Sequence, residues 1–174
     1  MNTIETWLSA ALLVSTPVLA QPQYCNTTHI RSTKPDSRYD VHPDGTVSDK
    51  ESGLMWMTCA IGMSGKRCEQ GKPTEFTWQA ALQFAETFNK QGGFAGHTDW
   101  RLPTVKESHT LIDRQCNNPA MNARVFINAP SYRFWTVSPV AATPEFTWGL
   151  ATDYGYVSPF GRRTLGLLRL VRYQ

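Results

Sequence analysis

The stretch Asp44–Cys59, DGTVSDKESGLMWMTC, decides the fold of this chain. Asp44-Gly45 is a turn signal, and Thr46–Asp49 after it alternates side chains in the manner of a half-buried strand. Gly53–Met57 is an apolar run of strand type, and Tyr39–His42 before the turn alternates like Thr46–Asp49. These three segments are predicted to form a small antiparallel unit.

Two helices are predicted in the middle of the chain. The first begins at Thr77 and ends near Asn89, because apolar side chains recur there at helical spacing (Trp78, Ala81, Leu82, Ala85, Phe88). The second begins at Thr104, where Glu107 completes a capping box, and its buried stripe is Leu111-Ile112.

Strands return in the last third of the chain. Runs rich in β-branched and aromatic residues, separated by Pro and Gly, cover residues 133–137, 146–151, 155–157 and 165–171. Helices in the middle and strands at both ends predict an α+β fold with an antiparallel sheet, rather than alternating βαβ units.

Composition and charge limit the class of protein. The 174 residues are 41% hydrophobic and 18% charged, which excludes a coiled coil, a collagen and a charge-rich disordered tail, and the length fits one domain. The net charge is +3, but the residues from Arg114 onward carry seven basic and two acidic side chains. A basic face can steer anionic ligands, whereas no motif that reads nucleic acid is present, so no nucleic-acid partner is expected.

The first twenty residues read as a signal peptide. Leu8–Ala20 is an uncharged apolar run of 13 residues, against the ~20 that span a bilayer. Cleavage is predicted before Gln21, which leaves no transmembrane segment in the mature chain. Residues 21–38 are predicted to form an irregular N-terminal segment, and the protein is expected in the periplasm or outside the cell.

Four cysteines follow the predicted cleavage site, which indicates two disulfides in an exported chain. Three pairings are possible. We favour Cys59–Cys68, because the eight residues between them are rich in turn formers, and Cys25–Cys116 then follows by elimination.

Five blocks in a fixed order resemble the bacterial Lcl C-terminal domain family: DGTVSDKESGLMWMTC, TWQAA (77–81), DWRLPTVKE (99–107) with LID (111–113), FWTVSPV (134–140) and LRLVR (168–172). The domain is assigned to residues 39–174. The resemblance implies a C-type-lectin-like fold, a twisted antiparallel sheet with two flanking helices and paired N- and C-terminal strands. The member that names the family is a collagen-like adhesin whose terminal domain binds sulfated glycans. Leu170 stands where the family usually has a cysteine, so the family's disulfide pairing is not transferred.

Catalytic and metal-binding patterns are not found. The four histidines are scattered, and no metalloprotease, nucleophile-elbow or phosphate-loop motif occurs. His97 and Asp99 lie two residues apart, but we interpret them as a hydrogen-bonded loop pair because a metal site needs further ligands. The Ca²⁺-binding loops of lectins are also missing. We expect no enzyme activity, cofactor or metal.

The candidate binding residues lie in the predicted hairpin region Trp148–Arg163, namely Trp148, Tyr154, Tyr156, Arg162 and Arg163. Aromatic faces beside guanidinium groups suit sugars that carry sulfate or carboxylate groups. The alternative is that Trp148 and Tyr156 pack into the core and the arginines are only solvated. The expected function is an exported, non-enzymatic binding module for anionic glycans, with an envelope protein-interaction or structural domain as the alternative.

Overall fold

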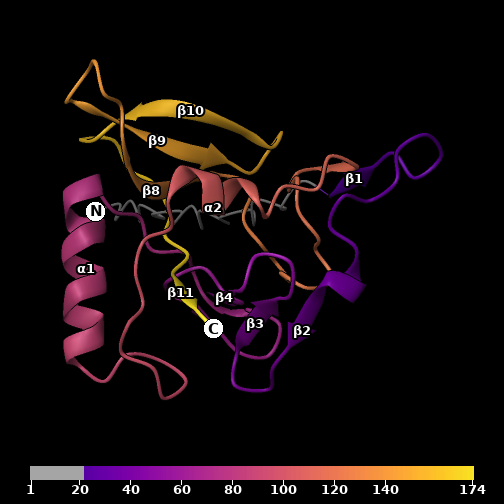
Figure 1. Cartoon of the computed structure of the whole chain (residues 1–174), viewed down its shortest axis with the longest axis horizontal. Coiled ribbons are helices and arrows are strands. Elements are labelled where there is room, and N and C mark those ends of the chain that lie inside the picture. Colours follow the sequence, from indigo (N-terminus) through magenta and orange to yellow (C-terminus); the bar gives the residue numbers. More distant parts are fainter. Residues whose placement is uncertain (1–21) are drawn as a thin grey trace, which may run out of the picture.

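The computed structural model describes residues 22–174, so the predicted signal peptide lies outside the described residues. The described chain is α+β, as predicted, with many short strands and few helices (Figure 1). The elements are β1 (Tyr24–Cys25), a 3₁₀ turn (Asp36–Arg38), β2 (Tyr39–Val41), β3 (Thr46–Asp49), β4 (Leu54–Met57), β5 (Met63–Ser64), β6 (Gln70–Gly71), α1 (Trp78–Lys90), α2 (Val105–His109), β7 (Cys116–Asn117), β8 (Arg133–Pro139), β9 (Phe146–Ala151), β10 (Tyr156–Gly161) and β11 (Val171–Tyr173).

The strands divide between two main sheets rather than forming one. A four-stranded sheet has the order β11-β4-β3-β2, a three-stranded sheet has the order β10-β9-β8, and β1-β7 and β5-β6 form two-stranded ribbons. All these pairings are antiparallel. In Figure 1 the three-stranded sheet lies at the top, the four-stranded sheet lies below it, and α1 stands along one side.

The C-terminal strand joins the sheet formed by the N-terminal strands. The last strand, β11, pairs with β4, while β2 lies at the opposite edge of the same sheet. Short turns place β2 and β4 on the two edges of β3, so the free edge of β4 receives β11.

The predicted turn between β2 and β3 is held by the Asp44 carboxylate. Its Oδ1 accepts hydrogen bonds from the Thr46 amide at 3.0 Å and the Thr46 hydroxyl at 2.7 Å. Gly45 has φ +87°, a left-handed conformation that glycine adopts without steric cost. Both side-chain and backbone chemistry therefore set this turn, as the sequence predicted.

Both helices begin where the sequence predicts. The Thr77 side chain caps α1, and Ala81 and Ala85 are buried on its inner face. Thr104 and Glu107 form the capping box of α2, and Glu107 also accepts two hydrogen bonds from the Arg101 guanidinium at 2.7 and 2.9 Å. However, α2 ends at His109, so the buried Leu111-Ile112 pair follows the helix instead of forming its stripe. The helix is too short to contain them.

The predicted strand over residues 165–171 is wrong except for its last residue. Strand β11 begins at Val171, and the preceding residues make only isolated bridges, to Phe76 and Phe134. Leu167, Leu168, Arg169 and Leu170 are all at most 3% exposed. The segment is buried from residue 166 to residue 170 and makes only isolated bridges, so it runs through the core without a continuous partner strand among the described residues.

The core is built around tryptophans. Trp56, Trp100 and Trp135 are almost completely buried. Trp56 lies in a cluster with residues of the four-stranded sheet, and the cluster of Trp100 and Trp135 joins the two sheets to α1. Two disulfides, Cys25–Cys116 and Cys59–Cys68, are present in the structure, as favoured from the sequence. The first ties β1 to β7, and the second closes the loop after β4.

Candidate functional site

The five residues predicted from the sequence all lie on or next to the β9–β10 hairpin. Trp148 is on β9, Tyr154 is in the turn, Tyr156 begins β10, and Arg162 and Arg163 follow its end. Tyr154 and Tyr156 are 69% and 49% exposed, and Trp148 is half-buried. Tyr156 and Arg162 are six residues apart, or about 20 Å at strand spacing. The predicted residues therefore do not form one compact cluster.

Strand alternation divides these residues between the two faces of the sheet. Trp148 lies opposite Pro159 and shares its face with Leu150. Tyr156 lies opposite Ala151, which in turn lies opposite Arg133 of β8. Tyr156, Arg133 and Arg162 thus belong to the same face, and Trp148 belongs to the other.

Three arginines, Arg133, Arg162 and Arg163, form what we call the arginine surface. Arg162 and Arg163 follow the end of β10 near α1, and Arg133 begins β8 and reaches toward the turn after β10 with its side chain. The Arg162 guanidinium lies over the Trp78 ring, 4.0 Å from its centre. The Arg133 guanidinium lies 5.3 Å from the centre of the Phe160 ring. Arg133 also donates to the Thr164 hydroxyl at 3.4 Å, so it reaches the turn that carries Arg163.

These arginines have no acidic partner in the part of the chain that the structure describes. Within residues 22–174 none of the three forms an ion pair, whereas Arg38, Arg101, Arg124 and Arg172 each do. One acid, Glu75, lies close to this surface. Its hydrogen bond and its charge raise the pKa of Tyr132, and the Arg133 guanidinium lies over the Tyr132 ring. The Arg133 and Arg162 guanidinium groups are thus held by aromatic rings, and they keep their charge available for an anion.

Sequence reasoning missed Arg133 and Trp78. Trp78 was counted only as an apolar position of the first helix, and Arg133 only as the first residue of a strand. The proximity of Trp78 to Arg162 depends on a hydrogen bond between distant segments, from the Trp78 backbone N–H to the Arg162 carbonyl at 3.0 Å, and Arg133 reaches Phe160 and Thr164 across the sheet. No local pattern carries that information.

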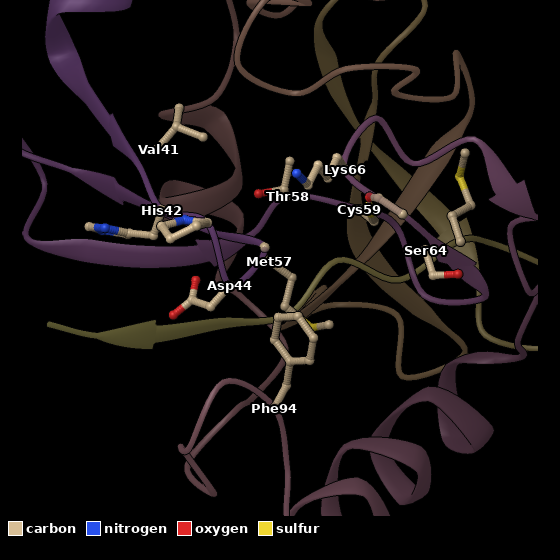
Figure 2. A pocket seen from close by; sticks show the side chains of 13 residues that line it. Val41, His42, Asp44, Met57, Thr58, Cys59, Ser64, Lys66 and Phe94 are labelled. Carbon is tan, nitrogen blue, oxygen red and sulfur yellow. Dashed lines mark hydrogen bonds between the residues drawn. The ribbon is translucent and has the colours of Figure 1, made fainter.

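A second feature is a hollow of about 460 Å³ beside the four-stranded sheet (Figure 2). The turn after β2 supplies His42, Asp44 and Gly45 to one side, and the Cys59–Cys68 loop supplies Ser64 and Lys66 to the other. Met57 and Phe94 lie between these two sides (Figure 2). We call this hollow the turn pocket.

Several polar groups of the turn pocket have defined partners. His42 Nε2 lies 2.9 Å from the Ser48 hydroxyl. The hydrogen bonds from Thr46 hold the pKa of Asp44 below its usual value, so its carboxylate is charged at neutral pH. By contrast, the Thr58 hydroxyl is buried without a hydrogen-bond partner among the described residues.

The described residues give no metal cluster: no group of three or more His, Cys, Asp or Glu side chains in residues 22–174 could hold an ion. Asp99 instead accepts a hydrogen bond from Arg172 at 2.7 Å, and the His97 ring packs edge-on to Trp100. In the same residues no helix is long and apolar enough to cross a membrane.

These observations define a small disulfide-bonded α+β domain with an unpaired arginine surface and a separate small pocket. The two disulfides are consistent with an oxidising, exported environment. The family model of the Lcl C-terminal domain matches residues 45–172, and the chain therefore belongs to that family. No curated protein matches the chain.

Proposed function

We propose that this chain is an exported, non-enzymatic binding module that recognises anionic glycans, such as sulfated polysaccharides, through its arginine surface. The observation that carries the proposal is that Arg133 and Arg162 are stacked on aromatic rings and, like Arg163, have no ion-pair partner within residues 22–174. Membership of the Lcl C-terminal domain family supports it.

The physical argument concerns pre-organisation. A guanidinium group binds sulfate or carboxylate through two parallel hydrogen bonds, and it is weakly hydrated. Stacking restricts the rotamers of two arginines before a ligand binds. Arg162 stacks on Trp78, and Arg133 stacks on Phe160. Less conformational entropy is then lost on binding. Tyr156, exposed on the same face, extends the surface along β10 for a polysaccharide chain.

The family also supports a C-type-lectin-like fold as part of this proposal. The shared sheet of β2, β3, β4 and the C-terminal β11 brings the two ends of the domain together, and α1 and α2 pack against the strands. A leader at residues 1–20 and a periplasmic or extracellular location belong to the same proposal.

The test is binding of a fluorescent heparin oligosaccharide to the disulfide-intact mature chain at low and high salt. Replacing Arg162→Ala with Arg163→Ala should weaken binding about tenfold or more, and added salt should weaken binding of the wild type. Arg31→Ala with Arg114→Ala removes the same charge from exposed arginines elsewhere and is the matched control.

Equal losses in the two double variants would show that bulk charge, not the arginine surface, attracts the ligand. Absence of binding at low salt would refute the proposed function. Recovery of one stoichiometric envelope protein in a pull-down would then favour the alternative, a protein-interaction domain.

A further inference from the structure

The turn pocket carries two opposite charges that do not neutralise each other. Asp44 lies on the β2–β3 side and Lys66 on the disulfide-loop side, and no ion pair joins them among the described residues. Oδ1 of Asp44 is occupied by Thr46, which leaves Oδ2 as a free acceptor. The pocket therefore offers a strong acceptor and a strong donor on opposite sides.

Between these charges the wall is apolar and includes an aromatic ring. Figure 2 shows the Phe94 ring with its face toward the viewer and Met57 beside it. The Ser64 hydroxyl adds a neutral hydrogen-bonding group, and the Thr58 side chain, 6% exposed as a residue, lines the wall. Aromatic surface next to a few polar groups is the usual composition of a small-molecule site.

The walls of the pocket are fixed before any ligand binds. Thr46 holds Asp44, and the left-handed Gly45 sits so close to Phe94 that an added Cβ would lie 3.0 Å from the ring. The Cys59–Cys68 disulfide closes the opposite wall. A volume of about 460 Å³ lies within the range of about 300–1,000 Å³ for small-molecule sites.

We propose that the turn pocket binds an uncharged pyranose ring, a neutral sugar unit of the glycan whose anionic groups contact the arginine surface. This inference rests on the proposed function and names a second ligand class for the same module. The C–H face of the sugar packs on Phe94. Its hydroxyls donate to Asp44 and accept from Lys66.

The charges of the wall argue against ligands that carry a single charge in this pocket. Asp44 repels a sulfate or carboxylate, and Lys66 repels an ammonium group, so either ion gains on one side and loses on the other. A sugar hydroxyl both donates and accepts, and it therefore uses both side chains without an uncompensated charge. The arginine surface instead prefers anionic groups, so the two sites differ in the ligand that they bind.

The experiment is a titration of the isotope-labelled, disulfide-intact mature chain with methyl glucoside, methyl galactoside and N-acetylglucosamine, followed by amide NMR spectra. We expect shifts in residues 41–45, 57–66 and 94, with a Kd on the order of 1 mM that high salt does not change. Asp44→Asn and Phe94→Leu should each weaken binding about fivefold or more. Arg162→Ala with Arg163→Ala should leave it unchanged.

If Phe94→Leu does not fold, Lys66→Gln replaces it as the pocket variant. Lys66 is exposed, so its substitution should retain the fold. Absence of shifts in these residues at about 20 mM sugar, twentyfold above the expected Kd, would overturn the inference. Equal binding by the wild type and all three pocket variants, or a preference of the pocket for glucose sulfate, would also overturn it. Sugar binding without heparin binding would refute only the claim that the arginine surface binds anionic glycans. Heparin binding without sugar binding would refute only the claim that the turn pocket binds a sugar.

Discussion

The ion pair between Arg38 and Asp49 provides a quantitative test of how the N-terminal sheet is held. The Asp49 side chain on β3 is completely buried and lies 2.6 Å from Arg38. It also accepts hydrogen bonds from the Ser52 hydroxyl at 2.6 Å and the Glu51 amide at 3.1 Å. Arg38 has a second acidic neighbour in the exposed Glu51. Replacing Asp49→Asn keeps the shape of the side chain but leaves Arg38 with only this solvated partner.

The expected loss of stability follows from this burial. Removing one partner of a buried ion pair costs about 3–5 kcal/mol, because the remaining charge stays buried. Glu51 retains part of the interaction with Arg38, so we expect about 3 kcal/mol for Asp49→Asn. For a domain of this length the melting temperature should fall by about 6–12 °C.

Chemical unfolding monitored by tryptophan fluorescence, with the disulfides intact, measures this change because Trp56 is fully buried beside β3. The matched control is Asp40→Asn in the same sheet, which removes an exposed pair with Lys50 and should cost about 0.2–1 kcal/mol. A loss below about 1 kcal/mol for Asp49→Asn would refute the claim that the buried pair stabilises the sheet.

The same pair predicts a pH dependence. Burial raises the pKa of Asp49, but hydrogen bonds from Arg38 and Ser52 outweigh it, so that this pKa lies below its usual value. A carboxyl group with a lowered pKa stabilises the fold above its unfolded pKa of about 3.9 and loses that effect as the pH falls through its folded pKa. The stability difference between wild type and Asp49→Asn should therefore shrink below about pH 4; a difference independent of pH would contradict it.

Two further perturbations test other parts of the scaffold. Glu107→Gln removes the charged partner of Arg101 at the start of α2, and thermal unfolding should show a loss of about 1–2 kcal/mol; an unchanged midpoint would contradict this. Cys59→Ser with Cys68→Ser opens a loop with a sequence separation of 9, which should cost about 2–3 kcal/mol in chemical unfolding. A smaller effect than that of a conservative core substitution such as Val47→Ala would contradict it.

The elements that local chemistry determines were predicted well. The Asp44-Gly45 turn, the start of α1 at Thr77 and the capping box of Thr104 and Glu107 each depend on residues within a few positions of one another. The sequence of residues 46–49 likewise predicts β3, although the structure buries all four residues instead of every second one. Turn and capping signals are local, so a single sequence contains them.

The segment before β11 shows where local reasoning fails. Residues 165–170 have the composition of a strand, and residues 166–170 are buried, but within residues 22–174 they make only isolated bridges and have no continuous partner strand. Composition indicates that side chains are buried. It does not indicate whether the backbone pairs with a continuous strand, because that strand comes from elsewhere in the chain.

The candidate site shows the same division. The sequence by itself determined the two helix starts, the N-terminal meander, the α+β class and an excess of arginine in the last third of the chain. Only the tertiary structure separated Trp148 from Tyr156, brought Trp78 to Arg162 and brought Arg133 to Phe160. It also assembled the turn pocket from three distant segments. Pairing register and side-chain stacking depend on which segments the fold places side by side, and those contacts lie far apart in sequence.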